Sequence, residues 1–261
     1  MKDFIVNAKT DVYAILGDPI EHSMSPVIHN SSFRRCGMDK VFLAVRCDPD
    51  HVDEMMRSLR FMWLKGYVFT MPLKELVFNH LDEIRDEAAL TGAINCVQND
   101  NGKLIGYNTD SIGFWTAVQE RNTAHRPIRK VFVMGMGGFS KAAVAQAALQ
   151  GVEEIVVANR SLPRLEECEK INNEFYPNTI PAEYYLTPEP GQNDAEMVKM
   201  GKGSLVINAT GLGKDAPGSP ITDNGIFPEN ALVWEINYRG ELDFMHQAEK
   251  QKESRNLTIE D

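Results

Sequence analysis

Long apolar runs, clustered cysteines and metal-ligand patterns are all missing from this sequence. No hydrophobic run approaches the length that spans a membrane. The opening residues 1–5 are too few and too polar to hold the apolar region of a secretion signal. The four cysteines form no Cys-x-x-Cys pair, and the histidines have no ligand spacing; the cysteines are Cys36, Cys47, Cys96 and Cys168. We therefore expect a cytoplasmic protein with reduced thiols, no disulfide framework and no metal site.

Positive charge is also scarce. The chain has 27 Lys and Arg against 37 Asp and Glu, a formal net charge of -10. Nucleic acids and anionic membranes select a basic face, so neither is an expected partner, whereas an anionic small molecule can still be held by local basic groups. With 261 residues, 43% of them hydrophobic, the chain is long enough for two modest globular domains.

Segments typical of strands and helices alternate through the first half, which indicates an α/β domain. The expected elements are 12–16, 26–36, 41–45, 50–59, 67–70, 83–90, 94–98 and a helix over 111–121. A polar stretch with a proline, 122–127, follows this helix and is the predicted linker. We therefore expect one domain over 1–121 and a second domain over 122–261.

The second half continues the alternation and predicts an open, mostly parallel sheet of the Rossmann type. The expected strands are 130–134, 154–158, 180–182, 204–208 and 231–235, and residues rich in Pro, Gly and Asp predict loops over 187–193 and 214–223.

The most informative motif is a buried strand that runs through Gly135, Gly137, Gly138 and Phe139 into a helix rich in alanine. This pattern is typical of a dinucleotide-binding turn, in which glycines let the backbone approach a pyrophosphate at a helix N-terminus. A tight turn that binds nothing is the alternative, since the glycine pattern alone is weak.

The end of the next strand predicts which dinucleotide binds. Asn159 and Arg160 stand where a nucleotide-binding unit contacts the adenosine ribose, with Arg164 one helical turn later and no acidic residue at that position. An arginine pairs with a 2′-phosphate, so the predicted cofactor is NADP, not NAD. The alternative is that both arginines belong to a solvated helix face.

Ser23 and Ser25 lie between the first strand and the first helix. Ser25 is a good N-cap and Pro26 is a good first helical residue. Helix capping therefore explains Ser25 and Pro26 without any function. Ser23 is then unexplained, and two hydroxyls beside exposed helix N–H groups can also hold a carboxylate.

Lys74 and Asp110 are the other candidates for chemistry. Lys74 follows a strand end and a proline, where α/β domains place functional side chains, although most lysines are merely solvated. Asp110, or Thr109 beside it, fits equally well as the N-cap of the following helix.

Taken together, these motifs resemble shikimate dehydrogenases and their quinate/shikimate relatives. The resemblance covers about residues 12–248 and rests on matching order and rough spacing. The motifs are 22–26 (HSMSP) with His29-Asn30, 70–74 (TMPLK), 92–95 (GAIN), 106–114 (GYNTDSIGF), the turn at 135–138, 159–161 (NRS) and 208–210 (NAT).

This resemblance implies a two-domain enzyme of aromatic amino-acid and chorismate biosynthesis, a monomer or homodimer, that interconverts shikimate and 3-dehydroshikimate with NADP. The domain over 1–121 would then be the substrate-binding catalytic domain, and the domain over 122–261 the NADP-binding Rossmann domain. Lys74 and Asp110 would be the catalytic pair. Substrate-binding residues would be Ser23, Ser25, Thr70, Asn95, Asp110 and Tyr238; Thr210 joins the expected cofactor site. Quinate-preferring members often carry threonine at one of the two serine positions, so the pair favours shikimate.

The sequence departs from the family at four positions and at its end. The family usually has Asn where Val68 stands, Thr where Cys96 stands, Asp where Glu235 stands and Pro where Gly240 stands. Its final helix, which returns to the first domain, is not expected here, and apolar surface would then be exposed. Two alternatives follow: a dehydrogenase for quinate or a related cyclic polyol acid, or a non-catalytic nucleotide-binding paralogue.

Overall fold

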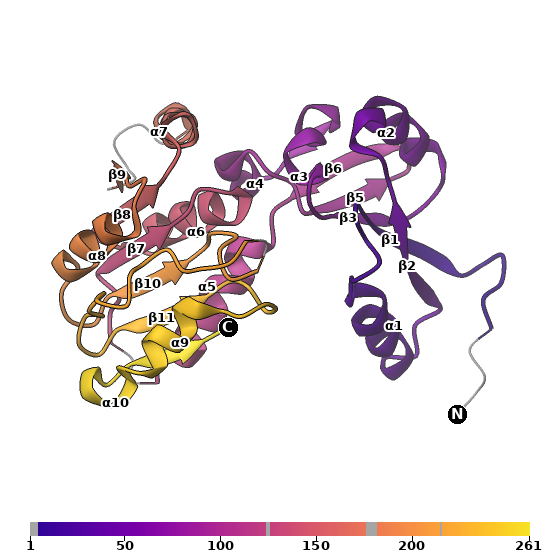
Figure 1. The fold of residues 1–261 in the computed structure, drawn as a ribbon. Helices are drawn as coiled ribbons and strands as arrows, with labels where there is room; N and C mark the ends of the chain where they lie inside the picture. Colours follow the sequence, from indigo (N-terminus) through magenta and orange to yellow (C-terminus); the bar gives the residue numbers. More distant parts are fainter. Residues whose placement is uncertain (1–4, 124–125, 176–181, 215) are drawn as a thin grey trace. The chain divides into compact units, whose positions relative to one another are not determined.

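The computed structural model describes residues 5–123, 126–175, 182–214 and 216–261 (Figure 1). Contacts divide the chain into two compact units, Met1–Thr109 and Asp110–Asp261. Parts of the opening stretch 1–5, of the predicted linker 122–127 and of the predicted strand 180–182 lie outside the described residues, and so does residue 215 of the predicted loop 214–223.

Unit 1 is a mixed six-stranded sheet in the order β2-β1-β3-β5-β6-β4. β1 pairs parallel with β2 and β3, β5 is antiparallel to β3 and β6, and β4 is parallel to β6. Its elements are β1 (Asp11–Gly17), α1 (Ser25–Arg35), β2 (Lys40–Arg46), η1 (Pro49–His51), α2 (Val52–Phe61), β3 (Gly66–Phe69), α3 (Leu73–Leu76), η2 (Phe78–His80), β4 (Glu83–Ile84), α4 (Asp86–Thr91), β5 (Cys96–Asp100) and β6 (Lys103–Tyr107).

Alternation along β1 separates two cores of different size. Ala14 and Leu16 pack with Met56 and Leu59 of α2 in the larger core, whereas Ile15 faces the smaller cluster on the other side of the sheet. A strand presents successive side chains to opposite faces, so this pattern fixes the register of the strand.

Helix α1 attaches to the edge strand β2 mainly through polar contacts. The Asn30 side chain donates to the carbonyl of Phe42 (2.8 Å) and accepts from its N–H (2.9 Å), and His29 stacks on the Phe42 ring at 4.3 Å. None of the helix residues is buried; Val27 and Ile28 are 56% and 60% exposed. Asn30 thus occupies backbone groups that an edge strand otherwise leaves open.

Unit 2 is a parallel six-stranded sheet in the order β12-β11-β10-β7-β8-β9. Its elements are α5 (Asp110–Arg121), β7 (Lys130–Met134), α6 (Gly138–Leu149), β8 (Glu154–Asn159), α7 (Leu162–Phe175), β9 (Ala182–Leu186), α8 (Pro190–Lys199), β10 (Leu205–Asn208), β11 (Leu232–Glu235), α9 (Asp243–Glu249), α10 (Lys252–Arg255) and β12 (Thr258–Glu260). The first strand of the unit, β7, lies at the centre, and the order reverses beside it as in a Rossmann fold.

Helices cover both faces of this sheet, as expected for a doubly wound fold. Val131 and Val133 of β7 pack in a core that includes residues of α5, α6 and α7. Phe132 and Met134 point the other way, into a core with residues of α8 and α9. Strand β7 is buried on both sides, which is why it is apolar throughout.

The observed division lies one helix before the predicted boundary at 121/122. Phe114, Trp115 and Val118 of α5 pack against the core of unit 2. The polar stretch after α5 shows where the helix ends. The apolar face of α5 decides that the helix belongs to unit 2.

Other differences involve short or weakly marked elements. The single element expected over 83–90 is a short strand, β4, followed by α4, and the predicted loop 187–193 contains the start of α8 at Pro190. β6 and β12 were not expected. The signal for β6 was present, because Asn101-Gly102 forms the tight turn of a β5–β6 hairpin, with φ of 52° and 95°.

Candidate functional site

The candidate residues of unit 1 meet at one edge of its sheet. Ser23 and Ser25 follow β1, and Thr70 and Lys74 follow β3. Asn95 precedes β5, which is antiparallel to β3, so the start of β5 lies at the same edge as the end of β3. Motifs that are far apart in the sequence therefore lie at the same edge of the unit 1 sheet.

Ser25 is the first residue of α1 and not its N-cap. The helix begins at Ser25 with Met24 as N-cap, and Ser23 Oγ accepts the N–H of Ser25 at 3.3 Å. The prediction that Ser25 is the N-cap is wrong by one residue, because Pro26 is tolerated anywhere in the first turn, where helix N–H groups lack intrahelical partners. Both serine side chains are partly exposed.

Lys74 stands on a short helix anchored to the sheet. The Thr70 N–H donates to the carbonyl of Leu16 (2.9 Å), and the Ile94 N–H donates to the carbonyl of Lys74 (2.8 Å). Leu73 is fully buried beneath the helix. Gly17 is required here, since a Cβ on it would lie 2.4 Å from Thr70 Cγ2. These contacts fix the backbone that carries Thr70 and Lys74.

Asn95 holds the segment that leads to Asp110. Its Oδ1 accepts the Thr109 N–H at 2.9 Å and its Nδ2 donates to Thr109 Oγ1 at 3.0 Å. The neighbouring Asn108 donates to Thr91 Oγ1 and to the carbonyl of Ala93, both at 3.0 Å. Asn95 is 6% exposed. Asp110 is the first residue of α5 and belongs to unit 2.

Val68 and Cys96, two departures from the family pattern, are register partners on β3 and β5. Val68 is half-buried and packs on the small cluster of Ile15, Ile20 and Phe42. An apolar residue there extends this cluster, which gives Val68 a packing role where the family has an amide. Cys96 is half-buried.

Two glycines of the turn in unit 2, Gly135 and Gly137, have different roles. Gly135 has φ +97°, and a Cβ on it would lie 2.7 Å from the Ala209 carbonyl oxygen and 2.9 Å from the Thr210 nitrogen. This glycine lets the chain after β10 approach β7. Gly137, by contrast, is extended and a Cβ on it would meet nothing within 4 Å. Of these two glycines, Gly137 is the one with open space beside it.

Helix α6 points its N-terminus at this open space. Lys141 N–H donates to the Gly137 carbonyl, so the N–H groups of Gly138, Phe139 and Ser140 precede the first intrahelical bond. Such groups, with the helix dipole, favour a phosphate. The Phe139 ring packs edge-on against Phe114 at 5.1 Å. Phe139 therefore offers its backbone N–H, while its ring belongs to the core.

The residues expected to select the dinucleotide lie at the end of the neighbouring strand. Asn159 ends β8; its Nδ2 donates to the Ser161 carbonyl (3.2 Å) and its carbonyl accepts from Thr187 (2.9 Å). Arg160 and Arg164 are exposed. β8 is parallel to β7, so both arginines lie at the same edge as the glycine turn.

Thr210 is held by a buried polar network that sequence reasoning missed. Asn208 Oδ1 accepts from the Thr210 N–H (3.0 Å) and Oγ1 (2.7 Å), while Asn208 Nδ2 donates to Glu235 (2.6 Å). Glu235 is fully buried at the end of β11. The available signal was an acidic residue ending an otherwise apolar strand, 232–235.

Tyr238 and Gly240 follow on the loop after β11. Tyr238 is 70% exposed. Gly240 has φ +103°, and a Cβ on it would lie 1.9 Å from the Gly213 carbonyl oxygen. The family's proline would not fit this backbone, since proline fixes φ near about −65°.

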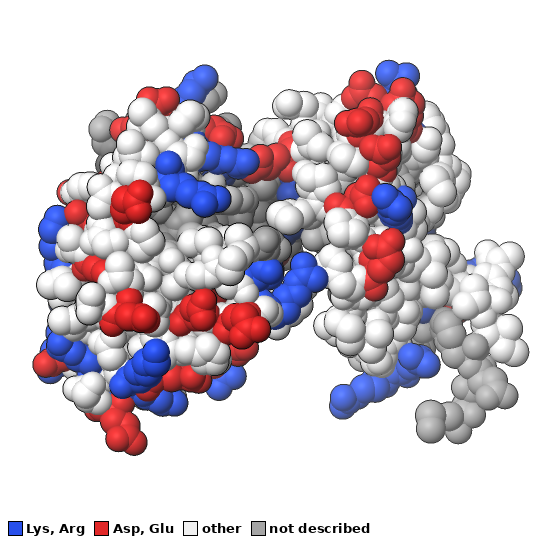
Figure 2. Space-filling view, viewed as in Figure 1, with Lys and Arg blue, Asp and Glu red and all other residues white. Residues whose placement is uncertain are grey.

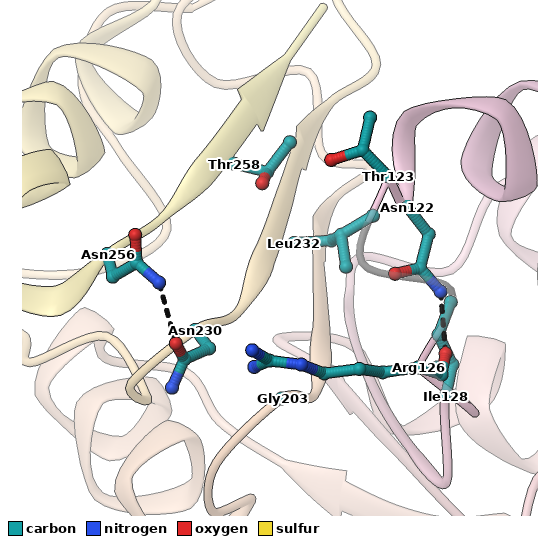
Figure 3. A pocket seen from close by; sticks show the side chains of 9 residues that line it. All are labelled: Asn122, Thr123, Arg126, Ile128, Gly203, Asn230, Leu232, Asn256 and Thr258. Atoms are coloured by element: carbon teal, nitrogen blue, oxygen red, sulfur yellow. Dashed lines mark hydrogen bonds between the residues drawn. The ribbon is translucent and has the colours of Figure 1, made fainter.

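A separate cavity of about 160 Å³ lies at the opposite end of the unit 2 sheet (Figure 3). It is lined by residues that precede or begin β7, β10, β11 and β12, with the Arg126 side chain extending across it. Asn256 donates to Asn230 at 2.7 Å on its far side. Rossmann folds bind nucleotides at the carboxyl ends of the strands, so this cavity is not the nucleotide site.

Neither a metal centre nor a membrane-spanning element is found where the structure is described. No group of three or more His, Cys, Asp or Glu side chains is placed to hold a metal ion, and none of the helices is both long and apolar enough to cross a membrane. In the view of Figure 2, acidic and basic side chains are interspersed on the visible face of each unit. This is not the continuous basic face that nucleic acids select.

The geometry is that of a two-unit α/β protein. One unit is a Rossmann unit whose glycine turn can hold a dinucleotide, and the other is a mixed-sheet unit with serine, lysine and amide side chains at one edge. Residues 15–97 match the family described as the shikimate dehydrogenase substrate binding domain.

A shikimate dehydrogenase (NADP(+)) from Caldanaerobacter subterraneus subsp. tengcongensis is 35% identical over 236 residues, 89% of this chain and 80% of the relative. The chain therefore belongs to the shikimate dehydrogenase family. Two solved structures are similar. The Listeria monocytogenes shikimate 5-dehydrogenase complex with shikimate and NAD has a TM-score of 0.82, 28% identity and coverage of 97% of this chain and 86% of that one. The Thermus thermophilus enzyme with NADP(H) and shikimate has a TM-score of 0.75, 27% identity and coverage of 95% and 86%.

Proposed function

We propose that this chain is an oxidoreductase that reversibly converts shikimate to 3-dehydroshikimate with NADP. The observation that carries the proposal is the convergence of Ser23, Thr70, Lys74 and Asn95 at one sheet edge in a member of this family. An NADP-dependent relative that is 35% identical supports the choice of reaction and cofactor.

Unit 1 would bind the substrate. Hydroxyls of Ser23 and Ser25, beside the first turn of α1, suit a carboxylate, because hydroxyls and helix N–H groups both donate to an anion. Thr70 and Asn95 suit ring hydroxyls. Asn95 also binds Thr109, the residue before Asp110, through its side-chain oxygen. Tyr238 is a further proposed substrate ligand, from the family resemblance.

Unit 2 would hold the dinucleotide. The open space beside Gly137 and the first N–H groups of α6 fit a pyrophosphate, and Arg160 with Arg164 fit a 2′-phosphate. When bound, the nicotinamide supplies or accepts the hydride. Gly135, Asn159 and Thr210 shape the same edge of the sheet.

Lys74 would act as the proton donor during carbonyl reduction. Hydride addition leaves negative charge on the carbonyl oxygen, and an ammonium supplies both a proton and a positive charge there. Asp110 would orient this ammonium and the substrate hydroxyl. In the oxidation direction the same pair would remove the hydroxyl proton.

A steady-state assay with shikimate or quinate, each with NADP+ or NAD+, tests this function. We expect the highest kcat/KM for shikimate with NADP+. Preference for quinate would reassign the substrate, and preference for NAD+ would reject the role of the two arginines. Absence of turnover with all four pairs, from protein that still binds NADP+, would support the non-catalytic alternative.

The cellular and assembly parts of the proposal need separate measurements. A cytoplasmic location is expected from the composition, and a monomer or homodimer from the family resemblance. Fractionation of cells and light scattering of the purified protein test these two points.

A further inference from the structure

The buried network around Glu235 points to a positioning role at the cofactor edge. Glu235 and Asn208 are register partners on β11 and β10 and both are fully buried. Within the described residues, no lysine or arginine forms an ion pair with Glu235. A buried carboxylate without a cation is costly unless hydrogen bonds satisfy it.

Four donor contacts converge on this carboxylate and its neighbours. One Glu235 oxygen accepts from Asn208 Nδ2 (2.6 Å), and the other accepts from the Asn237 N–H (2.9 Å) and Nδ2 (2.8 Å). Asn237 Nδ2 also donates to the Thr210 carbonyl (3.0 Å). The hydrogen-bond partners of Glu235 in the described structure are all donors, which favours the ionised carboxylate, whereas burial raises the pKa of this carboxyl.

The hydrogen-bond network of Glu235 extends to the loop that follows β10. Donation by Asn208 Nδ2 to Glu235 fixes the orientation of the Asn208 amide, so that its oxygen faces the N–H and hydroxyl of Thr210. Thr210 Oγ1 then accepts the Leu212 N–H (3.2 Å). Ala209 and Thr210 are also the residues that lie against Gly135 in the glycine turn.

We propose that Glu235 is a positioning residue for dinucleotide binding: its carboxylate orients Asn208 and Asn237, which together hold the Thr210 loop against the glycine turn. This inference rests on the proposed function only in that unit 2 binds NADP. It assigns a role to a side chain that differs from the family's usual aspartate and that touches no proposed ligand itself.

Glu235→Gln tests this role because it retains size and removes an acceptor. Its amide NH2 must face a donor, which forces the Asn208 amide to turn and present its NH2 to Thr210. At pH 8 we expect the dissociation constant for NADP+, measured by calorimetry, to rise about tenfold. The KM for shikimate and kcat at saturating NADP+ should change less than twofold.

Two further variants complete the experiment. Glu235→Asp keeps the carboxylate and should restore most of the affinity that Glu235→Gln loses. Glu229→Gln removes an exposed carboxylate before the same strand and should leave NADP+ binding unchanged. Thermal unfolding of each variant identifies any that fails to fold, in which case Asn208→Asp replaces Glu235→Gln as the test, because it exchanges the donor for an acceptor.

The outcomes separate this inference from the proposed function. Equal NADP+ affinity of wild type and Glu235→Gln would overturn the positioning role. Equal losses in NADP+ affinity, shikimate KM and kcat would indicate general destabilisation and would overturn it as well. Failure of the wild type to bind NADP+ would instead reject the proposed cofactor.

Discussion

Substitution of Gly135 and of Gly137 by alanine should separate stability from cofactor binding. At Gly135 an alanine must adopt φ +97° with its Cβ 2.7 Å from a backbone carbonyl. Such a conformation costs about 1–3 kcal/mol, and the backbone contact must also shift. Because unit 2 is of a size at which each kcal/mol lowers Tm by about 2–4 °C, we expect a decrease of about 2–12 °C for Gly135→Ala.

Gly137→Ala should leave Tm nearly unchanged and weaken NADP+ binding. Its Cβ meets nothing within 4 Å, and its backbone is open to any L-residue. Loss of the N-cap preference and the lower entropy of the unfolded chain are each about 0.5–1 kcal/mol and oppose one another, so Tm should change by less than about 4 °C. The methyl group, however, occupies the space proposed for the pyrophosphate. Loss of one hydrogen bond to a charged group, about 1.5–3 kcal/mol, would weaken NADP+ binding about 10- to 100-fold.

Thermal unfolding and titration calorimetry with NADP+ measure both quantities on the same protein. Gly191→Ala is the matched control, since it adds a methyl to α8 with its nearest neighbour 3.9 Å away and should leave NADP+ binding unchanged. If Gly137→Ala binds NADP+ as tightly as the wild type, the phosphate does not lie beside Gly137. If Gly135→Ala melts like the wild type, the close approach of the loop after β10 does not constrain the turn.

Three other predictions concern single side chains. Lys74→Ala should lower kcat for shikimate by about 10²–10⁴-fold, the range for a lost general acid, with NADP+ affinity unchanged; an unaltered kcat would refute its role. Arg160→Ala should raise the KM for NADP+ about tenfold and leave the KM for NAD+ the same, because only the 2′-phosphate contact is lost. Asp82 accepts from Arg60 (2.5 Å) and from the Leu104 N–H (2.7 Å), which lowers its pKa. Above the pKa of the unfolded chain, the lowered pKa of the Asp82 carboxyl stabilises the fold, and this stabilisation is lost as pH falls through the pKa of the folded state. Asp82→Asn should therefore cost about 0.5–1 kcal/mol at pH 7 and progressively less at acid pH, measured by urea unfolding.

The sequence predicts the parts of the fold that depend on local pattern. The apolar strand 130–134, the glycine turn and the alanine-rich helix all lie where their periodicity and composition place them. Order along the chain then identifies a Rossmann unit, because alternating strands and helices leave few topologies. Long elements with strong periodicity are the most predictable for the same reason.

The differences arise where distant residues decide the outcome. β12 has three residues and exists because it pairs with β11. Helix α5 follows unit 1 directly in sequence, but its apolar face matches the core of unit 2. No local sequence pattern predicts the pairing of β12 or the packing of α5, since both depend on contacts with residues that are distant in the sequence.

The same limit applies to the glycine turn. The sequence shows that glycines are present there, but it does not show why each position requires a glycine. Gly135 is required by the protein's own loop, which Asn208 and Glu235 hold against it. Gly137 is not required by any contact within the described structure. A glycine that packing demands would be retained whether or not a ligand binds, so Gly135 is weak evidence for a dinucleotide. Gly137 carries the stronger argument, because it lies beside open space at a helix N-terminus, where a backbone without a side chain lets an anion approach.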